Sequence, residues 1–567
     1  MTPGSCHWSR ALALPLLLAA AFATTLNAAA ATMELPVPGR AAIASAHPLA
    51  TAAGDEVLAA GGNAFDAAVA VSAALGVVEP FSSGLGGGGF YLLHRASDGL
   101  QTVVDARERA PAAATADMYL DAQGQVITAK VREGALAAGI PGNAAGLAHL
   151  AKHYGKLPLA RSLAPAVRLA REGFIVDQRL SVLTERNVDK LKRYGEGARV
   201  WLIDGRAPKP GERLRNPDLA HTLESIGADG GESFYRGKLA KRLVAGVRKH
   251  GGMWTTADLA AYKVVERAPV VGVYRGHRIV TAPPPSSGGI TVVETLNVLS
   301  GYDLAAAPAD LRAHLIVEAW RRAYRDRAEF MGDPDFVQVP VARLLDPMYA
   351  AGLRATIRHD KATPSALLPI AQAQSESSST THFSVLDADG NRVAGTQTVN
   401  FRYGSGVMPD GTGVVLNNEM DDFSAKTGVP NGFGLVSTEV NAVAPGKRPL
   451  SSMAPTFVEG PKGIAILGTP GGSRITSMVV LGILDHVAGG DAASMVRVPR
   501  FHHQFLPDQL QYEPGGLDPA VIEALRARGH EMREGSRRYG NMNAVTWVYG
   551  HAPLAATDPR NETLVDF

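Results

Sequence analysis

The stretch "ESSSTTHFSVLDADGNRVAGTQTVN", residues 376–400, places a cluster of hydroxyl side chains directly before a strand-like run. The run reaches Asp389-Gly390 and resumes after it, which is typical of a β-hairpin. Partner positions of an antiparallel hairpin lie symmetrically about its turn. Thr380 is therefore predicted to lie opposite the stretch from Thr398 to Asn400, so that one hairpin builds a hydroxyl site.

A threonine is a weak nucleophile unless a base removes its proton, and its own free α-amine is one such base. That amine has a pKa of about 8, which suits general-base work near neutral pH. An internal threonine gains a free amine only when the bond before it is cut. Residues 361–379 lack periodicity and predict an exposed linker, so self-cleavage between Ser379 and Thr380 is one interpretation. The other is that Ser and Thr simply favour strand starts and turns.

The bulk composition excludes some classes of partner. The 567 residues suffice for several domains or one large multilayer core. A formal net charge of +2, with 19% charged residues, gives no electrostatic reason to propose nucleic acid or an anionic membrane as a partner.

The N-terminus has the pattern of a secretory signal peptide. Arg10 precedes the apolar run "ALALPLLLAAAFATTL", and "NAAAAT" then offers small residues for cleavage. We expect a signal peptide over residues 1–31, with an uncleaved anchor as the alternative, and no membrane span after it. The only cysteine, Cys6, would leave with this peptide. The mature chain would then hold no disulfide and no thiol nucleophile, and would be periplasmic or secreted.

Several helices are predicted along the chain. The segment from Asp55 to Val78 reads as helix interrupted at Gly61-Gly62-Asn63, and its second piece is apolar on nearly every side, which predicts burial. Residues 143–248 are mostly helical by pattern, as are residues 311–330, 477–488 and 519–528. After Thr380 the pattern changes to strands with Asp-Gly turns.

Ordered motifs elsewhere favour the nucleophile interpretation. Upstream of the hairpin lie "LGGGGF", "ARERAP", "PPPSSGG" and "GDPDF"; from Thr380 onward come "TTHFSV", "LNNEMDDFS", "KRPLSSMAPT", "GTPGGSRI" and "PRFHHQ". From about Ala41 onward the chain resembles the γ-glutamyltranspeptidase (glutathione hydrolase) family. The resemblance implies an α+β N-terminal-nucleophile hydrolase, a four-layer αββα sandwich. It also implies a precursor that cuts itself before Thr380 into a large subunit, 32–379, and a small subunit, 380–567, which stay together.

The resemblance also implies a set of site residues. Arg107 matches the arginine that binds the substrate α-carboxylate, and a guanidinium suits this role because it forms a fork. Ser451 and Ser452 supply hydroxyl donors to the same carboxylate. The α-ammonium would be held by Asn400, Glu419 and Asp422. Gly471 and Gly472 match the backbone donors of the oxyanion hole, and Thr398 matches the threonine that hydrogen-bonds the nucleophile. Without this resemblance, we would interpret Arg107 as a surface arginine and Asp421-Asp422 as a solvated turn or helix cap.

Two other motifs are weaker signals. "GLGGGG" satisfies the G-x-G-x-x-G pattern at Gly84, Gly86 and Gly89, but the strand-like "FYLLH" follows where a dinucleotide fingerprint must open a helix. His502 and His503 are adjacent and lack a spaced third ligand, so we interpret them as structural. We expect neither an organic cofactor nor a metal.

The expected activity is transfer of a γ-glutamyl group from glutathione or a related amide to Thr380, and then to water, an amino acid or a dipeptide. One alternative is a cephalosporin or glutaryl acylase of the same fold, for which an acceptor of the α-ammonium is unnecessary. The other is a non-catalytic binding protein for γ-glutamyl peptides. One departure stands out: bacterial relatives with a lid loop usually carry tyrosine where this chain has Phe433. The glycine-rich loop from Thr427 to about Thr438 is predicted to be mobile over the pocket.

Overall fold

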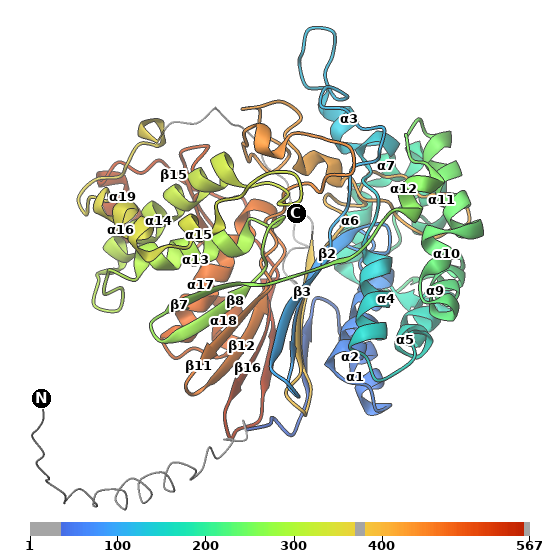
Figure 1. The fold of residues 1–567 in the computed structure, drawn as a ribbon, viewed down its shortest axis with the longest axis horizontal. Coiled ribbons are helices and arrows are strands. Elements are labelled where there is room, and N and C mark those ends of the chain that lie inside the picture. The colour runs from blue at the N-terminus through green and yellow to red at the C-terminus, as the bar shows by residue number, and fades with distance from the viewer. Residues whose placement is uncertain (1–35, 369–379, 561–567) are drawn as a thin grey trace, which may run out of the picture. The chain divides into compact units, whose positions relative to one another are not determined.

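Two six-stranded antiparallel sheets face each other in the unit that begins at Pro38 (Figure 1). The computed structural model describes residues 36–368 and 380–560, so the expected signal peptide and Ser379 lie outside the described residues. The first sheet has the order β1 (Ala42–Ser45), β9 (Thr381–Leu386), β10 (Arg392–Thr398), β2 (Gly88–Arg95), β3 (Leu100–Ala106), β6 (Val265–Arg267). The second has the order β17 (Leu554–Thr557), β16 (Asn543–Val548), β12 (Gly463–Gly468), β11 (Thr456–Gly460), β8 (His277–Thr281), β7 (Val270–Tyr274).

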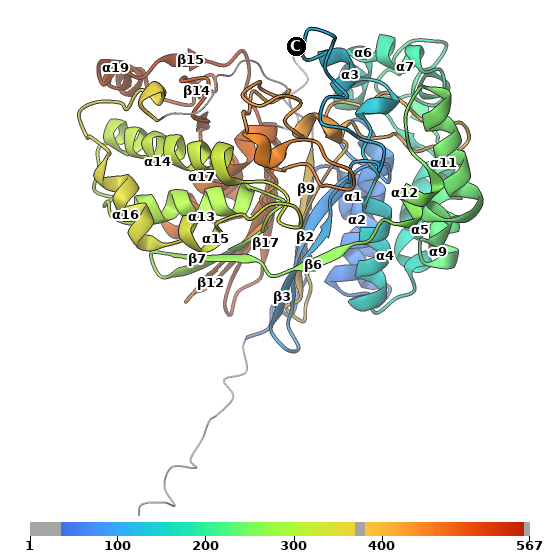
Figure 2. The ribbon, with the colours of Figure 1, turned by 45° about the horizontal axis from the view of Figure 1, so that its top comes forward.

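Helices cover the outer face of each sheet (Figure 2). The layer on the first sheet contains α1 (Pro48–Ala59), α2 (Ala64–Val78), α4 (Asn143–His153), α5 (Leu159–Glu172), α9 (Pro217–Asp229) and α11 (Gly237–Lys249). The layer on the second contains α13 (Gly288–Leu299), α14 (Ala309–Phe330), α15 (Val341–Leu344), α16 (Pro347–Ala355), α17 (Ile475–Val487), α18 (Ala492–Arg497) and α19 (Pro519–Ala527). The predicted α+β αββα sandwich is therefore confirmed.

Shorter elements connect these layers. The short helices are α3 (Thr128–Arg132), α6 (Gln178–Glu185), α7 (Val188–Arg193), α8 (Glu196–Trp201), α10 (Glu232–Tyr235) and α12 (Thr256–Ala260). The short strands are β4 (Phe174–Ile175), β5 (Arg213–Leu214), β13 (Phe501–His502), β14 (Leu510–Tyr512) and β15 (Met532–Glu534). The predicted helices agree in kind with these elements, but the first begins at Pro48 rather than at Asp55.

The hairpin of β9 and β10 is fixed at its turn by Asp387. The Asp387 carboxylate accepts hydrogen bonds from the backbone N–H groups of Asp389 and Asn391, and Gly390 takes a φ of +94° that favours glycine. Its other oxygen accepts from the Ala64 N–H at the start of α2. A capping box between Asn63 and Asp66 begins the same helix. One carboxylate thus ties the hairpin to the helix behind it.

The hairpin register confirms the symmetric pairing. Thr381 pairs with Gln397 and Leu386 with Arg392, so Thr380 falls opposite Thr398. Both faces of β9 are buried, because α2 packs on one face and the strands β12 and β16 lie on the other. Ser384 donates a hydrogen bond to the Asn543 carbonyl of β16. Since side chains alternate along a strand, the face that carries Ser384 also carries Thr380 and looks toward the second sheet.

The predicted exposed linker, residues 361–379, is only partly exposed at its beginning, where Ala362 and Ser365 are buried but Ala366 and Leu367 are exposed. Ser365 is buried, its hydroxyl donates to the Phe505 carbonyl, and its N–H donates to Asp508. The chain is therefore fixed in place at Ser365, because Ser365 forms hydrogen bonds with a segment more than a hundred residues further along the sequence. Residues 369–379 of the same linker lie outside the described residues.

The described helices were compared in length and apolarity with what a membrane span requires. Within residues 36–368 and 380–560, none of them combines the length and the apolarity that crossing a bilayer requires.

The glycine run before β2 permits a close backbone approach, which yields a stability prediction. A Cβ at Gly87 would lie 1.9 Å from the Thr398 carbonyl oxygen. Gly87→Ala should therefore destabilise the fold by at least about 1–3 kcal/mol, measured as the midpoint of urea unfolding. The matched control is Gly352→Ala in α16, where an added Cβ meets nothing within 4 Å and should stabilise by up to about 1 kcal/mol. A Gly87→Ala protein as stable as wild type would contradict this packing.

Candidate active site

Thr380 and Thr398 meet at the entrance of the hairpin. The Thr380 hydroxyl donates to Thr398 Oγ1 over 3.3 Å, and Thr398 Oγ1 also accepts the Asn400 N–H at 2.7 Å. Both threonines are buried, at 5% and 2% exposure. Asn400 has a φ of +73°, which bends the chain out of β10 toward the pocket. Thr398 is therefore held by the backbone that follows it and can orient the Thr380 hydroxyl.

A small pocket of about 20 Å³ gathers almost all of the predicted site residues. It is lined by Arg107, Thr380, Thr398, Asn400, Glu419, Asp422, Phe433, Ser451, Ser452, Met453, Gly472 and Ile475. These residues come from the end of β3, the hairpin, the loops between β10 and β11, and the turn after β12. Gly471 precedes a lining residue without lining the pocket itself, and Ser379 lies outside the described residues.

Arg107 is the charged centre of the pocket. It is fully buried, which corrects the surface interpretation, and its guanidinium forms ion pairs with Glu419 and Asp422. Its Nε donates to the Pro449 carbonyl at 3.1 Å. Burial raises the pKa of both carboxyl groups, and the charge of Arg107 opposes that rise. The group expected to bind a carboxylate is therefore paired with the groups expected to bind an ammonium.

Glu108 adds a third buried carboxyl group that the sequence reasoning did not assign. Its Oε2 lies 3.5 Å from Arg107 Nη1, and burial raises its pKa to about 7 despite the nearby guanidinium. Neither of its carboxyl oxygens has a hydrogen-bond partner among the described residues. Arg107 is thus close to three buried carboxyl groups, and the two that line the pocket, Glu419 and Asp422, suit a ligand that carries a cation.

Two asparagines that sequence reasoning did not assign support the acidic turn Glu419–Asp422. Asn417 Oδ1 accepts the N–H groups of Glu419 and Gly139. The Asn418 carbonyl accepts from the Asn400 side-chain amide at 2.9 Å, so the Asn400 amide oxygen remains as an acceptor for a ligand. Their only sequence signal is their position directly before the acidic residues in "LNNEMDD".

The serine pair is positioned by the "PPPSSGG" segment. The Ser451 N–H donates to the Pro285 carbonyl at 2.8 Å. In return, the Ser451 carbonyl accepts from the N–H and the hydroxyl of Ser287. Ser451 is buried and Ser452 half-buried. This rigid segment, which leads into α13, therefore sets the backbone from which both serines face the pocket.

Gly471 and Gly472 form a turn that only glycine adopts readily. Their φ values are +148° and +56°. A Cβ at Gly472 would lie 2.3 Å from the Phe433 ring, and one at Gly471 would lie 2.5 Å from the Met478 methyl group. The backbone thus reaches the pocket where a side chain would collide, an arrangement suited to backbone N–H donors beside a reacting carbonyl.

Comparison with known proteins decides the family. The sequence model described as Gamma-glutamyltranspeptidase matches residues 50–565. The chain belongs to the γ-glutamyltranspeptidase family.

Relatives in this family match nearly the whole chain. The glutathione hydrolase proenzyme of Pseudomonas sp. (strain A14) is 43% identical over 91% of this chain and 90% of its own. The glutathione hydrolase proenzyme of Escherichia coli (strain K12) is 42% identical over 92% and 90%. Among solved structures, a cephalosporin acylase from Bacillus halodurans superposes with a TM-score of 0.81 at 31% identity, covering 93% of this chain and 95% of that one.

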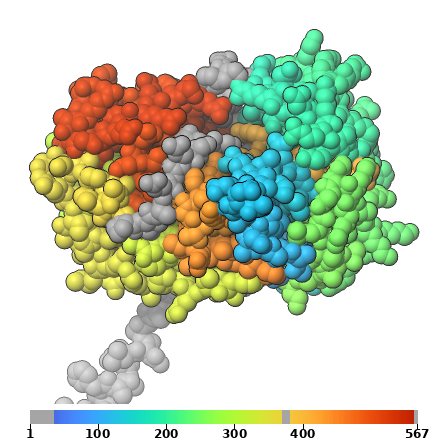
Figure 3. Space-filling model, turned by 90° about the horizontal axis from the view of Figure 1, so that it is seen from above, coloured from blue at the N-terminus to red at the C-terminus, as the bar shows by residue number. Residues whose placement is uncertain are grey.

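The segment expected as a lid in this γ-glutamyltranspeptidase-family chain packs onto the pocket. The Phe433 ring stacks on Phe401 at a centroid distance of 4.9 Å and is 6% exposed. The Gly432 N–H donates to Asp421, whose pKa burial raises to about 6, and Gln504 donates to the Phe433 carbonyl. The loops between β10 and β11 lie on the face seen in Figure 3, in orange beside the blue segment that precedes α3. Phe433 therefore covers the turn that contains Gly472.

The histidines form hydrogen bonds within the core. His502 bonds to Ser477 and Gln504, and His503 bonds to Asp508 and to the Phe505 N–H. Among the described residues, one group brings its possible metal ligands within 4.8 Å of one another, namely His314, Glu318 and His530. Both Glu318 oxygens are already paired with Arg321 and Arg322, and His314 hydrogen-bonds His530 at 2.7 Å. We assign no metal to this network.

The ion pairs of Arg107 generate a two-variant prediction. Arg107→Lys keeps the cation but loses the fork, so it should mature normally and lose activity on α-amino-acid donors. Arg107→Ala also leaves buried carboxyl groups uncompensated, which costs about 3–5 kcal/mol of stability and about 2–5 kcal/mol of transition-state binding. The measurements are kcat/KM on a γ-glutamyl anilide and the unfolding midpoint. Wild-type activity in both variants would remove Arg107 from the site.

Proposed function

We propose that this enzyme transfers the γ-glutamyl group of glutathione and related γ-glutamyl compounds through an ester on Thr380. The single observation that supports this most strongly is that Thr380 shares one pocket with Arg107 and the acidic pair of Glu419 and Asp422. A γ-glutamyl donor carries an α-carboxylate, an α-ammonium and a γ-carbonyl. The pocket offers a guanidinium, carboxylates and a hydroxyl for these three groups.

Donor binding exchanges the internal ion pairs for ion pairs with the substrate. The donor α-carboxylate takes the fork of Arg107 together with the hydroxyls of Ser451 and Ser452. Its α-ammonium is accepted by Glu419, Asp422 and the amide oxygen of Asn400. Arg107 and the two carboxylates, which give up their ion pairs with each other, thus form new ion pairs with the donor. Because no buried charge is left unpaired, donor binding costs little extra desolvation free energy. A ligand that lacks either charge would leave one partner buried and unpaired.

The chemistry proceeds in two acyl transfers. The α-amine of Thr380 takes the hydroxyl proton while Oγ1, oriented by Thr398, attacks the γ-carbonyl carbon. The N–H groups of Gly471 and Gly472 stabilise the oxyanion. The C–N bond then breaks, the leaving amine takes the proton, and the γ-glutamyl ester remains on Thr380. Water or the amine of an amino acid or dipeptide next attacks this ester and regenerates Thr380.

Maturation uses the same hydroxyl. Thr380 Oγ1 attacks the Ser379 carbonyl carbon, the peptide nitrogen of Thr380 leaves, and an ester forms. The departing nitrogen takes a proton and becomes the free α-amine of Thr380. Water then hydrolyses the ester to a carboxylate on Ser379 and restores the Thr380 hydroxyl. The boundaries proposed are a signal peptide over 1–31, a large subunit over 32–379 and a small subunit over 380–567, with the mature enzyme periplasmic or secreted.

A cephalosporin or glutaryl acylase is the second candidate, because the Bacillus halodurans acylase superposes on this chain. A glutaryl group has no ammonium, so Glu419 and Asp422 would face it without a cation. We therefore favour the γ-glutamyl donor. Release of p-nitroaniline from a γ-glutamyl anilide, run beside a glutaryl anilide, separates the two activities. Turnover of only the glutaryl compound would overturn the proposal, and turnover of neither would point to a binding protein.

Self-cleavage can be tested by mass and N-terminal sequence. Wild-type protein should yield a fragment of about 20 kDa, from its share of the residues, that begins with TTHFSV. Thr380→Ala should remain one chain without activity, since it lacks the attacking hydroxyl. A cleaved Thr380→Ala protein would show that another group or a protease cuts the chain.

The residue at position 433 generates a prediction about water and acceptor. Phe433 lacks the hydroxyl with which a tyrosine would reach Asn400, a bond worth about 0.5–1.5 kcal/mol. The lid should therefore open more easily and admit water to the ester. Phe433→Tyr should raise the ratio of transfer product to free glutamate at fixed Gly-Gly. An unchanged ratio would mean that ring packing on Phe401 alone closes the lid.

A further inference from the structure

The residue after the nucleophile is anchored on the opposite face of its strand. Thr381 points away from the second sheet toward the helix layer, and its hydroxyl donates to Glu79 Oε2 at 3.0 Å. Glu79 directly follows α2 as its C-terminal capping residue and is 1% exposed. The helix behind β9 therefore holds the first residue of this strand through a single side-chain hydrogen bond.

Glu79 belongs to a buried charge group. Its other oxygen forms an ion pair with Arg179 of α6, whose side chain is 7% exposed. The Arg179 guanidinium lies over the Phe81 ring at 5.0 Å, and Arg402 lies over the same ring at 5.4 Å. Arg402 comes two residues after Asn400 of the pocket and donates to Ser82. Glu79 is thus the carboxylate that faces the buried guanidinium of Arg179 and the half-buried guanidinium of Arg402 behind the nucleophile.

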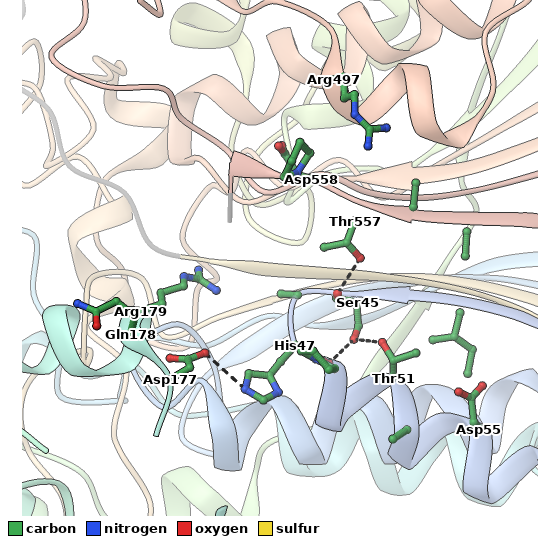
Figure 4. A pocket seen from close by; sticks show the side chains of 17 residues that line it. Ser45, His47, Thr51, Asp55, Asp177, Gln178, Arg179, Arg497, Thr557 and Asp558 are labelled. Carbon is green, nitrogen blue, oxygen red and sulfur yellow. Dashed lines mark hydrogen bonds and ion pairs between the residues drawn. The ribbon is translucent and has the colours of Figure 1, made fainter. Parts of the chain in front are cut away.

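A groove of about 870 Å³ runs along the outer side of this group (Figure 4). Arg179 lies at one end of the groove beside Gln178, and His47 faces Asp177 at 3.6 Å. Glu79 does not line the groove, so solvent reaches Arg179 before it reaches the carboxylate. Other charged groups that act on this group include His47, Asp177, Arg186 and Arg537.

We propose that Glu79 is a positioning residue for Thr380, fixing the start of β9 through the Thr381 hydroxyl and favouring the protonated α-amine through its charge. This inference rests on the proposed function, in which that amine is the base. Neighbouring residues of a strand are about 3.3 Å apart along its axis, so the carboxylate acts on the amine from across a single strand. A negative charge at such short range stabilises an ammonium group, and burial reduces screening by salt.

Two near-isosteric variants separate position from charge. Glu79→Gln keeps an oxygen that can accept the Thr381 hydroxyl but removes the charge. It should move the acidic limb of the kcat/KM profile to lower pH by about 0.5–1 unit. Thr381→Val keeps the charge and the side-chain shape but removes the hydroxyl. It should lower kcat about tenfold through misplacement of the nucleophile, with the acidic limb and KM unchanged.

The experiment uses full-length protein whose cleaved fraction is measured by mass, with γ-glutamyl anilide as substrate. Activities are normalised to that fraction, and Thr380→Ala is run beside them as the inactive reference. If Glu79→Gln does not fold, Thr381→Val still decides the positioning role, and Glu79→Asp, which keeps the charge, should leave the acidic limb in place. Normal kinetics and pH profile in Glu79→Gln and Thr381→Val, even with lower stability, would overturn the inference. A wild-type enzyme without activity would instead overturn the proposed function.

Discussion

The register between β9 and β10 is the constraint on which the site depends. It is set at the turn by Asp387, and it places Thr380 opposite Thr398. A slip of one residue would turn every side chain of β9 to the other face. Thr380 would then face the helix layer and Thr381 the second sheet. Both faces of the strand are buried, and they differ in chemistry. Only one register lets the Ser384 hydroxyl bond to the second sheet while the Thr381 hydroxyl bonds to Glu79 on the helix side.

The charged pocket depends on the same construction. Arg107 directly follows β3, which is separated from β10 by β2 in the sheet. Its side chain contacts the acidic turn Glu419–Asp422, which follows the hairpin in sequence. Gly88, the first residue of β2, lets the residue after Arg107 approach the strand, because a Cβ at Gly88 would lie 2.5 Å from a Glu108 oxygen. Buried charges are costly unless they are paired, and here the pairs are those that a zwitterionic substrate would replace. In the function that we propose, these charges would favour a ligand with an α-amino-acid end.

Local signals predicted the local structure well. The Asp389-Gly390 turn predicts the hairpin and its pairing, and the apolar run after Asn63 predicts the buried α2, because these features depend on residues close in sequence. The burial of Arg107 could not be predicted from its neighbours alone, since its partner Glu419 lies 312 residues away. The contact between Thr381 and Glu79, 302 residues apart, could not be predicted from neighbouring residues either. Nor could the contact of Ser365 with Asp508, which anchors part of the predicted exposed linker. Motif resemblance named residues that the structure brings into one pocket, but it did not name the asparagines that support the acidic turn.

The most direct test of the nucleophile is to trap its ester. Wild-type enzyme would be mixed briefly with a γ-glutamyl anilide without an acceptor, quenched in acid, digested and measured by mass. The expected result is a mass gain of one γ-glutamyl group on the peptide that begins at Thr380, which disappears when Gly-Gly is added before the quench. A γ-glutamyl adduct on another residue, or turnover with Thr380 replaced by alanine, would contradict the assignment of Thr380 as nucleophile.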